Sequence, residues 1–174
     1  MRHFLIRLMV FLVLLAAIAE VFFRTVIPAR ESPIVRQEST FKLMQYDPEG
    51  IQNGQFTSGR QAQQKAAWSI NDAGWNSDRD YLMQGPDKRP IVALTGDSQI
   101  EGFYIEHEEH VVRRLEKLSD ERILGYSFGV AGYKLAEYTQ LARYLAHRDI
   151  RPSVFVMYIN RGDIWRSVTN LGGK

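Results

Sequence analysis

The order of apolar and polar residues divides the 174-residue chain into three parts. An uninterrupted apolar run lies near the N-terminus, a polar stretch with several prolines and glutamines follows, and the last part alternates short apolar runs with amphipathic stretches. Long runs that are apolar on every face indicate a membrane or core helix, and short alternating runs indicate strands and surface helices. We therefore predict an N-terminal apolar helix, a polar spacer with an aromatic lead-in, and an α/β region, over residues 1–26, 27–88 and 89–174.

The N-terminal region is long enough to cross a bilayer. Residues 4–23 make 20 largely apolar positions, about the number that a membrane-spanning helix needs. Arg2 and Arg7 form a positive flank, which keeps the short N-terminus inside the cell. We expect a single-pass anchor in the cytoplasmic membrane, with the rest of the chain facing the periplasm or the outside. A cleaved signal peptide with small residues Ala17 and Ala19 is an alternative, and a buried core helix is a third.

The polar spacer ends in an aromatic lead-in. Trp68, Trp75 and Tyr81 lie between asparagine and glycine residues that favour turns. We expect these rings to pack against the region that follows.

The last region has the order strand, helix, strand, helix, strand. Three short apolar runs predict strands and two amphipathic stretches predict helices, over residues 91–94, 123–128 and 154–159, and over 108–118 and 134–147. In the first helix, the apolar side chains predict the buried face, at Val111, Val112, Leu115 and Leu118. This order favours a parallel sheet covered by helices on both faces, a three-layer α/β/α sandwich. Ligands bind such sheets beyond the C-terminal strand ends, which here are residues 95–102, 129–132 and 160–163.

The first of these segments holds a candidate nucleophile. Ser98 directly follows an apolar strand and opens a helical stretch, within the sequence Gly96-Asp97-Ser98-Gln99-Ile100-Glu101-Gly102. A serine at this place exposes its hydroxyl near free backbone N–H groups, which suits an acyl-enzyme mechanism with an oxyanion held by main-chain donors. An alternative is a simple turn, in which Asp97 or Ser98 caps the next helix.

This segment resembles the first block of the SGNH (GDSL-type) hydrolases, a family of serine esterases and acetyl-transfer enzymes. The second block is similar to Phe128-Gly129-Val130-Ala131-Gly132-Tyr133, and the resemblance implies that Gly129 supplies an oxyanion N–H. The third block departs from the pattern, because Gly162-Asp163 stands where the family has an Asn-Asp pair and Asn160 comes two residues early. Asn160 is a candidate third oxyanion donor if its loop is remodelled. The resemblance implies a flavodoxin-like sheet, here incomplete at the C-terminus.

The general base of that family is a histidine that follows an aspartate by three residues, and this chain has no such pair. We interpret His107 and His110 as part of a solvated, charged helix start, and place His147 at a helix end far from Ser98. We therefore expect the sequence to be the front part of a longer protein.

Charge and composition exclude several kinds of site and partner. The chain carries a net charge of +2 and no cysteine, which excludes a thiolate nucleophile and a cysteine zinc site. The positive charge is concentrated before residue 31, so a nucleic-acid partner is not expected. We expect neither a cofactor nor a metal. The favoured function is cleavage or transfer of an acyl or acetyl group on envelope glycans or lipids, and the alternative is a non-catalytic glycan- or protein-binding module with the same fold.

Overall fold

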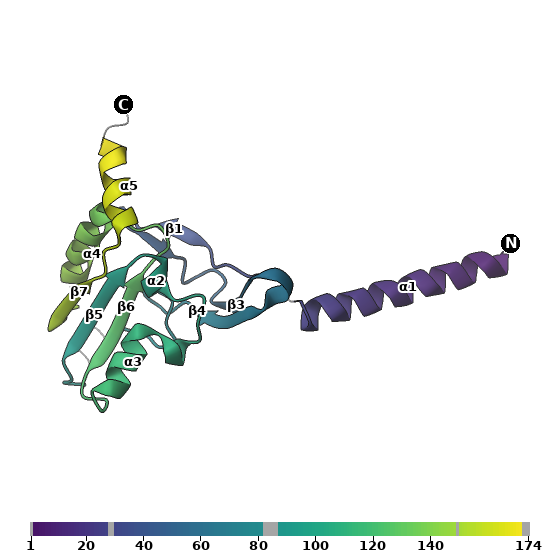
Figure 1. Ribbon diagram of the computed structural model, residues 1–174, viewed down its shortest axis with the longest axis horizontal. Helices are drawn as coiled ribbons and strands as arrows, with labels where there is room; N and C mark the ends of the chain where they lie inside the picture. The colour runs from purple at the N-terminus through teal and green to yellow at the C-terminus, as the bar shows by residue number, and fades with distance from the viewer. Residues whose placement is uncertain (1, 28–29, 82–86, 149, 172–174) are drawn as a thin grey trace.

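The computed structural model describes residues 2–27, 30–81, 87–148 and 150–171, and shows a mixed α/β body with a long N-terminal helix (Figure 1). The strands are β1 (Val35–Gln37), β2 (Met44–Tyr46), β3 (Asn53–Ser58), β4 (Gln64–Ser69), β5 (Ile91–Gly96), β6 (Leu124–Gly129) and β7 (Val154–Met157). The α-helices are α1 (Arg2–Thr25), α2 (Ser98–Glu101), α3 (Val111–Leu118), α4 (Leu135–His147) and α5 (Arg161–Leu171). Two 3₁₀ turns are η1 (Arg60–Ala62) and η2 (His107–Glu109).

Helix α1 extends away from the body and packs against none of it (Figure 1). Its most apolar 18-residue stretch has a mean hydropathy of 2.5, and none of its 24 residues is buried. The helix is therefore long and apolar enough to span a membrane. The alternative of a buried core helix is wrong, because the apolar side chains of α1 lie outside the core.

The parallel sheet has the strand order β6-β5-β7. Gly96 of β5 is opposite Gly129 of β6, and Thr95 is opposite Met157 of β7, so the C-terminal ends of the three strands lie at one edge. The prediction of three parallel strands is confirmed. Strand β7 is nevertheless an exposed edge strand, with Val154 and Met157 about half exposed.

Helices cover both faces of this sheet, as predicted. On one face, α4 places Tyr138 and Leu141 in the main core against Phe128. On the other face, Leu94 of β5 packs in a smaller cluster with residues of α2 and α3. The sheet thus separates two apolar layers.

The region before the sheet belongs to the same core. It forms two antiparallel pairs, β1 with β2 and β3 with β4. Its two tryptophans, Trp68 and Trp75, are almost fully buried, and so is Tyr81. Trp75 packs edge-on against Phe128, and Tyr81 stacks on Tyr126. The predicted packing of the aromatic lead-in is confirmed, and most of what the sequence indicated to be a spacer is part of the folded body.

Side chains close the outer edge of β6. Tyr81 Oη donates to Ser127 O at 2.6 Å and accepts from Ser127 N at 2.9 Å. Two residues earlier in β6, Glu116 accepts from Gly125 N at 2.6 Å and Arg79 donates to Gly125 O at 2.9 Å. These side chains occupy the positions that a neighbouring strand would take.

Glu116 also corrects the predicted buried face of α3. The helix turns Val112 and Glu116 inward, while Val111 is 45% and Leu118 is 81% exposed. Burial alone would raise the pKa of Glu116, but hydrogen bonds from Arg79, the Gly125 N–H and Arg113 outweigh it and lower the pKa. A charged side chain on the inner face is stable here because each carboxylate oxygen is paired.

Candidate functional site

Ser98 is the first residue of α2, directly after the central strand β5. The preceding residue, Asp97, caps this short helix, because its Oδ1 accepts from Gln99 N at 3.0 Å. The capping role weighed from the sequence therefore belongs to Asp97. The Ser98 side chain is half-buried and makes no hydrogen bond to any residue that the structure describes, which leaves its hydroxyl available to a substrate.

The far end of α2 is fixed by side chains from three other segments. Ser127 Oγ of β6 donates to Ile100 O at 2.8 Å, and Asn76 Nδ2 donates to Glu101 O at 2.9 Å. A ring nitrogen of His110 lies 3.1 Å from Gly102 O. Carbonyls at a helix end lack intrahelical partners, so these contacts satisfy them and hold the helix that presents Ser98.

Asn160, in the connection that follows β7, makes a hydrogen bond at this site. Its Nδ2 donates to Asp97 Oδ2 at 2.6 Å, so the side chain lies beside the residue that precedes Ser98. Its Oδ1 accepts from Asp163 N at 3.1 Å, and Asp163 Oδ2 accepts from Asn160 N at 3.0 Å, a reciprocal cap of α5. An amide nitrogen carries two hydrogens. One of them is used on Asp97 and the other is free for a ligand.

Asp163 is fully buried behind Asn160. Its Oδ2 also accepts from Tyr138 Oη at 3.0 Å, while its Oδ1 is buried with no partner among the described residues. The side chain thus serves to hold the β7–α5 connection against α4. Of the residues compared with the third block, Asp163 makes these packing contacts, and Asn160 is the residue that contacts Asp97 beside Ser98.

The two glycines after β6 differ in their surroundings. Gly129 is buried, and a Cβ there would lie 2.2 Å from Glu101 N, so this glycine permits the backbones of β6 and α2 to touch. Gly132 has φ +87° and nothing within 4 Å of a Cβ. Gly129 therefore has a packing reason to be glycine, whereas Gly132 has a conformational one. The oxyanion role proposed for Gly129 stays a prediction.

Two further glycines allow close approaches around Ser98. A Cβ on Gly96 would lie 2.4 Å from Ile100 Cγ1, and one on Gly102, where φ is +74°, would lie 2.7 Å from the His110 ring. A Cβ on Gly162 would lie 2.9 Å from Asn160 Oδ1. The glycines singled out in the sequence thus keep α2 and Asn160 close to the strand ends.

Sequence reasoning missed Glu101 as a feature of this site. It is only 3% exposed, and its Oε1 accepts from Tyr46 Oη and, at 2.7 Å, from Ala131 N. Burial raises the pKa of this carboxyl, against the lowering effect of both hydrogen bonds. Glu101 therefore ties α2 to the loop after β6 and to the N-terminal hairpins. A glutamate within Ser98-Gln99-Ile100-Glu101 gives no local signal of burial.

The interpretation of His107 and His110 as a solvated helix start is wrong. Both are buried, with ring centroids 4.9 Å apart. Burial is the main cause that lowers both pKa values, that of His110 to about 4. His107 Nε2 lies 3.1 Å from Ser69 Oγ. Both rings are committed to contacts away from Ser98.

Within the described residues, three or more metal-ligating side chains do not gather at any point. Comparison of the chain with family models, with curated proteins and with solved structures finds no match. The site offers a serine hydroxyl at the end of parallel strand β5, flanked by the amide donor of Asn160 from the connection after β7.

Proposed function

We propose that the chain is a membrane-tethered domain of the SGNH (GDSL-type) hydrolase kind, which cleaves or transfers an acyl group through an acyl-enzyme on Ser98. The observation that carries the proposal is the contact between Asn160 and Asp97. This contact brings the residue after β7 beside Ser98, which follows β5, without remodelling of the loop.

In this proposal, the Ser98 hydroxyl oxygen attacks the ester carbonyl carbon, and the carbonyl oxygen becomes an oxyanion. Helix geometry leaves the Ser98 N–H without an intrahelical acceptor, so it can donate to that oxyanion. The free hydrogen of Asn160 Nδ2 and the N–H of Gly129 are the further proposed donors. Loss of one such donor lowers the rate by ~10²–10³-fold in serine hydrolases.

The attack also requires a base to accept the hydroxyl proton. No histidine among the described residues contacts Ser98, and a protonated serine is a weak nucleophile. We therefore expect very low esterase activity from this chain. We expect far higher activity from a form extended by an Asp-x-x-His segment. The same observation favours the alternative function, a binding module that holds an acylated glycan or lipid without turnover.

Chemical rescue distinguishes the two functions. Hydrolysis of p-nitrophenyl acetate by the full chain in detergent is measured with and without added imidazole, which can act as an external base. The proposal expects an imidazole-dependent rate above that of the Ser98→Ala variant, and a lower rescued rate for Asn160→Ala. The matched control is Ser119→Ala, at the end of α3, which should be rescued like the wild type. Equal rates with and without Ser98 would reject the nucleophile and support the binding module.

Tethering is part of the proposal. The length and apolar character of α1 support a span of the cytoplasmic membrane, and Arg2 and Arg7 support an orientation that places the body outside.

A further inference from the structure

A cavity of about 180 Å³ lies where the segment after α1 meets the end of α2. Its walls include Val35, Tyr46, Phe56, Glu101 and Phe103. One water molecule needs only ~10–15 Å³ of such space, so the cavity has room for a small organic group. Ala131, from the loop after β6, also lines the cavity.

The only carboxyl group deep in this cavity has one oxygen free, among the residues that the structure describes. Glu101 Oε1 receives hydrogen bonds from both Tyr46 Oη and Ala131 N, whereas Oε2 has no hydrogen-bond partner. Burial raises the pKa of Glu101, which shifts its carboxyl toward the neutral form. A neutral carboxyl donates one hydrogen bond, and the satisfied Oε1 leaves Oε2 as the donor. The matching ligand group is an uncharged acceptor, such as an ester carbonyl.

The other charged groups at the cavity are already engaged. The Arg30 guanidinium lies 4.1 Å from the centre of the Phe56 ring, and Glu31 Oε2 accepts from Gln55 N at 2.8 Å. These two opposite charges sit next to each other at the mouth, so neither an anion nor a cation is favoured there. The aromatic walls then select an apolar group.

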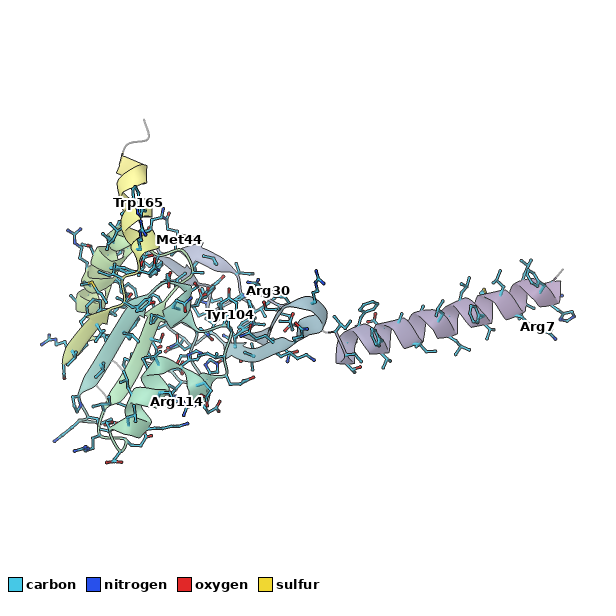
Figure 2. All side chains as sticks on the ribbon, in the orientation of Figure 1. Arg7, Arg30, Met44, Tyr104, Arg114 and Trp165 are labelled. Atoms are coloured by element: carbon cyan, nitrogen blue, oxygen red, sulfur yellow. The ribbon has the colours of Figure 1, made fainter. Side chains whose placement is uncertain are left out.

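The cavity lies on the side of the body from which α1 extends. Figure 2 shows Arg30 and Tyr104 close to the β3–β4 hairpin on that side. Arg30 follows Thr25, the last residue of α1, by five residues, and five residues span at most ~18 Å when extended. If α1 crosses the membrane, the mouth of the cavity is held near the lipid surface.

We propose that this cavity binds the acyl chain of a lipid ester taken from the membrane surface, with the ester carbonyl hydrogen-bonded to Glu101. The inference rests on the proposed function for its role, because Glu101 lies one helical turn after Ser98. A lipid ester bound in the cavity waits beside the nucleophile, and its carbonyl leaves Glu101 for the oxyanion donors when Ser98 attacks. The binding itself does not depend on catalysis.

Fluorescence quenching by a short brominated ester tests the binding. Trp68 is buried with its ring 5.8 Å from that of Phe103, a wall of the cavity, so bromine in the cavity quenches its emission. The full chain with Trp165→Phe, which removes an exposed tryptophan, is titrated in detergent with methyl 6-bromohexanoate and, separately, with 6-bromohexylammonium. We expect saturable quenching by the ester and none beyond the background by the amine.

Two substitutions at one position identify the hydrogen bond. Glu101→Gln keeps an oxygen for Tyr46 and Ala131 and an N–H donor toward the cavity, so it should bind the ester within about threefold of the wild type. Glu101→Leu loses the donor and should weaken binding about tenfold, the equivalent of one hydrogen bond. Glu108→Leu, an exposed glutamate outside the cavity, should bind as the wild type does.

The outcomes separate this inference from the proposed function. Ester quenching that does not saturate, or equal quenching in Glu101→Leu and the wild type, overturns the cavity site. Preference for the amine, lost in Glu101→Gln, also overturns it by showing a carboxylate that binds a cation. If Glu101→Leu does not fold, the ester and amine titrations of the wild type and Glu101→Gln decide. Ser98→Ala should bind the ester normally, so a failed imidazole rescue with intact quenching rejects only the catalytic proposal.

Discussion

Acidification should destabilise the body through His110. The ring is buried against His107, near Gly102 O, and these surroundings lower its pKa to about 4 from an ordinary value of 6.5, burial being the largest cause. Between these two pH values the unfolded chain binds a proton that the folded chain does not, so the free energy of unfolding falls as the pH falls. The gap corresponds to about 3 kcal/mol, because one pKa unit equals about 1.4 kcal/mol. This contribution of His110 to the free energy of unfolding is fully present above pH 6.5 and is lost as the pH falls toward 4.

The variant His110→Gln separates this effect from every other titration. Its Nε2 can still donate to Gly102 O, but it has no charge to gain. Urea unfolding of the full chain in detergent can be followed by tryptophan fluorescence, because Trp68 and Trp75 are fully buried in the body and α1 contains no tryptophan. From pH 7 to pH 4.5, the wild type should lose ~2–3 kcal/mol more stability than the variant. Parallel pH profiles for the two proteins would refute the reasoning.

Three further outcomes are expected. Gly129→Ala should destabilise the body by ~1–3 kcal/mol in urea unfolding, because the new Cβ meets Glu101 N at 2.2 Å; an unchanged midpoint would show that β6 and α2 can separate at no cost. Glu116→Gln should cost ~2–3 kcal/mol in the same assay, because it places an uncharged amide at a buried position between two arginine partners, and stability equal to the wild type contradicts the pairing. Carbonate extraction should leave the protein in the membrane fraction with its N-terminal residues intact, whereas a soluble product beginning at Glu20 indicates a cleaved signal.

The sheet was predictable because each of its strands is a short apolar run next to a glycine or proline. The hairpin β3–β4 was not, since Asn53–Ser58 is largely polar and half-exposed, so it lacks the apolar alternation that identifies a strand. The aromatic lead-in was recognised by its large rings between turn residues. Helix α5 begins at a reciprocal cap between Asn160 and Asp163, a signal in the sequence that the expected catalytic pair obscured.

Buried charge could not be predicted from the local sequence. Glu101, Glu116 and His110 each stand among other polar residues and match the pattern of a solvated face. Their burial depends on partners far along the chain, such as Tyr46 for Glu101 and Arg79 for Glu116. The position of Ser98 followed from the strand before it, but the contact of Asn160 with Asp97 depends on the side-by-side placement of β5 and β7.

The closed edge of β6 limits where a strand from another chain can pair with the sheet. Tyr81, Arg79 and Glu116 already fill the hydrogen-bonding positions along that edge, so an intruding strand from another chain would have to displace them. Among the described residues, no such side-chain plug covers β7. Misassembly by strand addition, the hazard that open edges bring, is thereby blocked at one border and confined to the other.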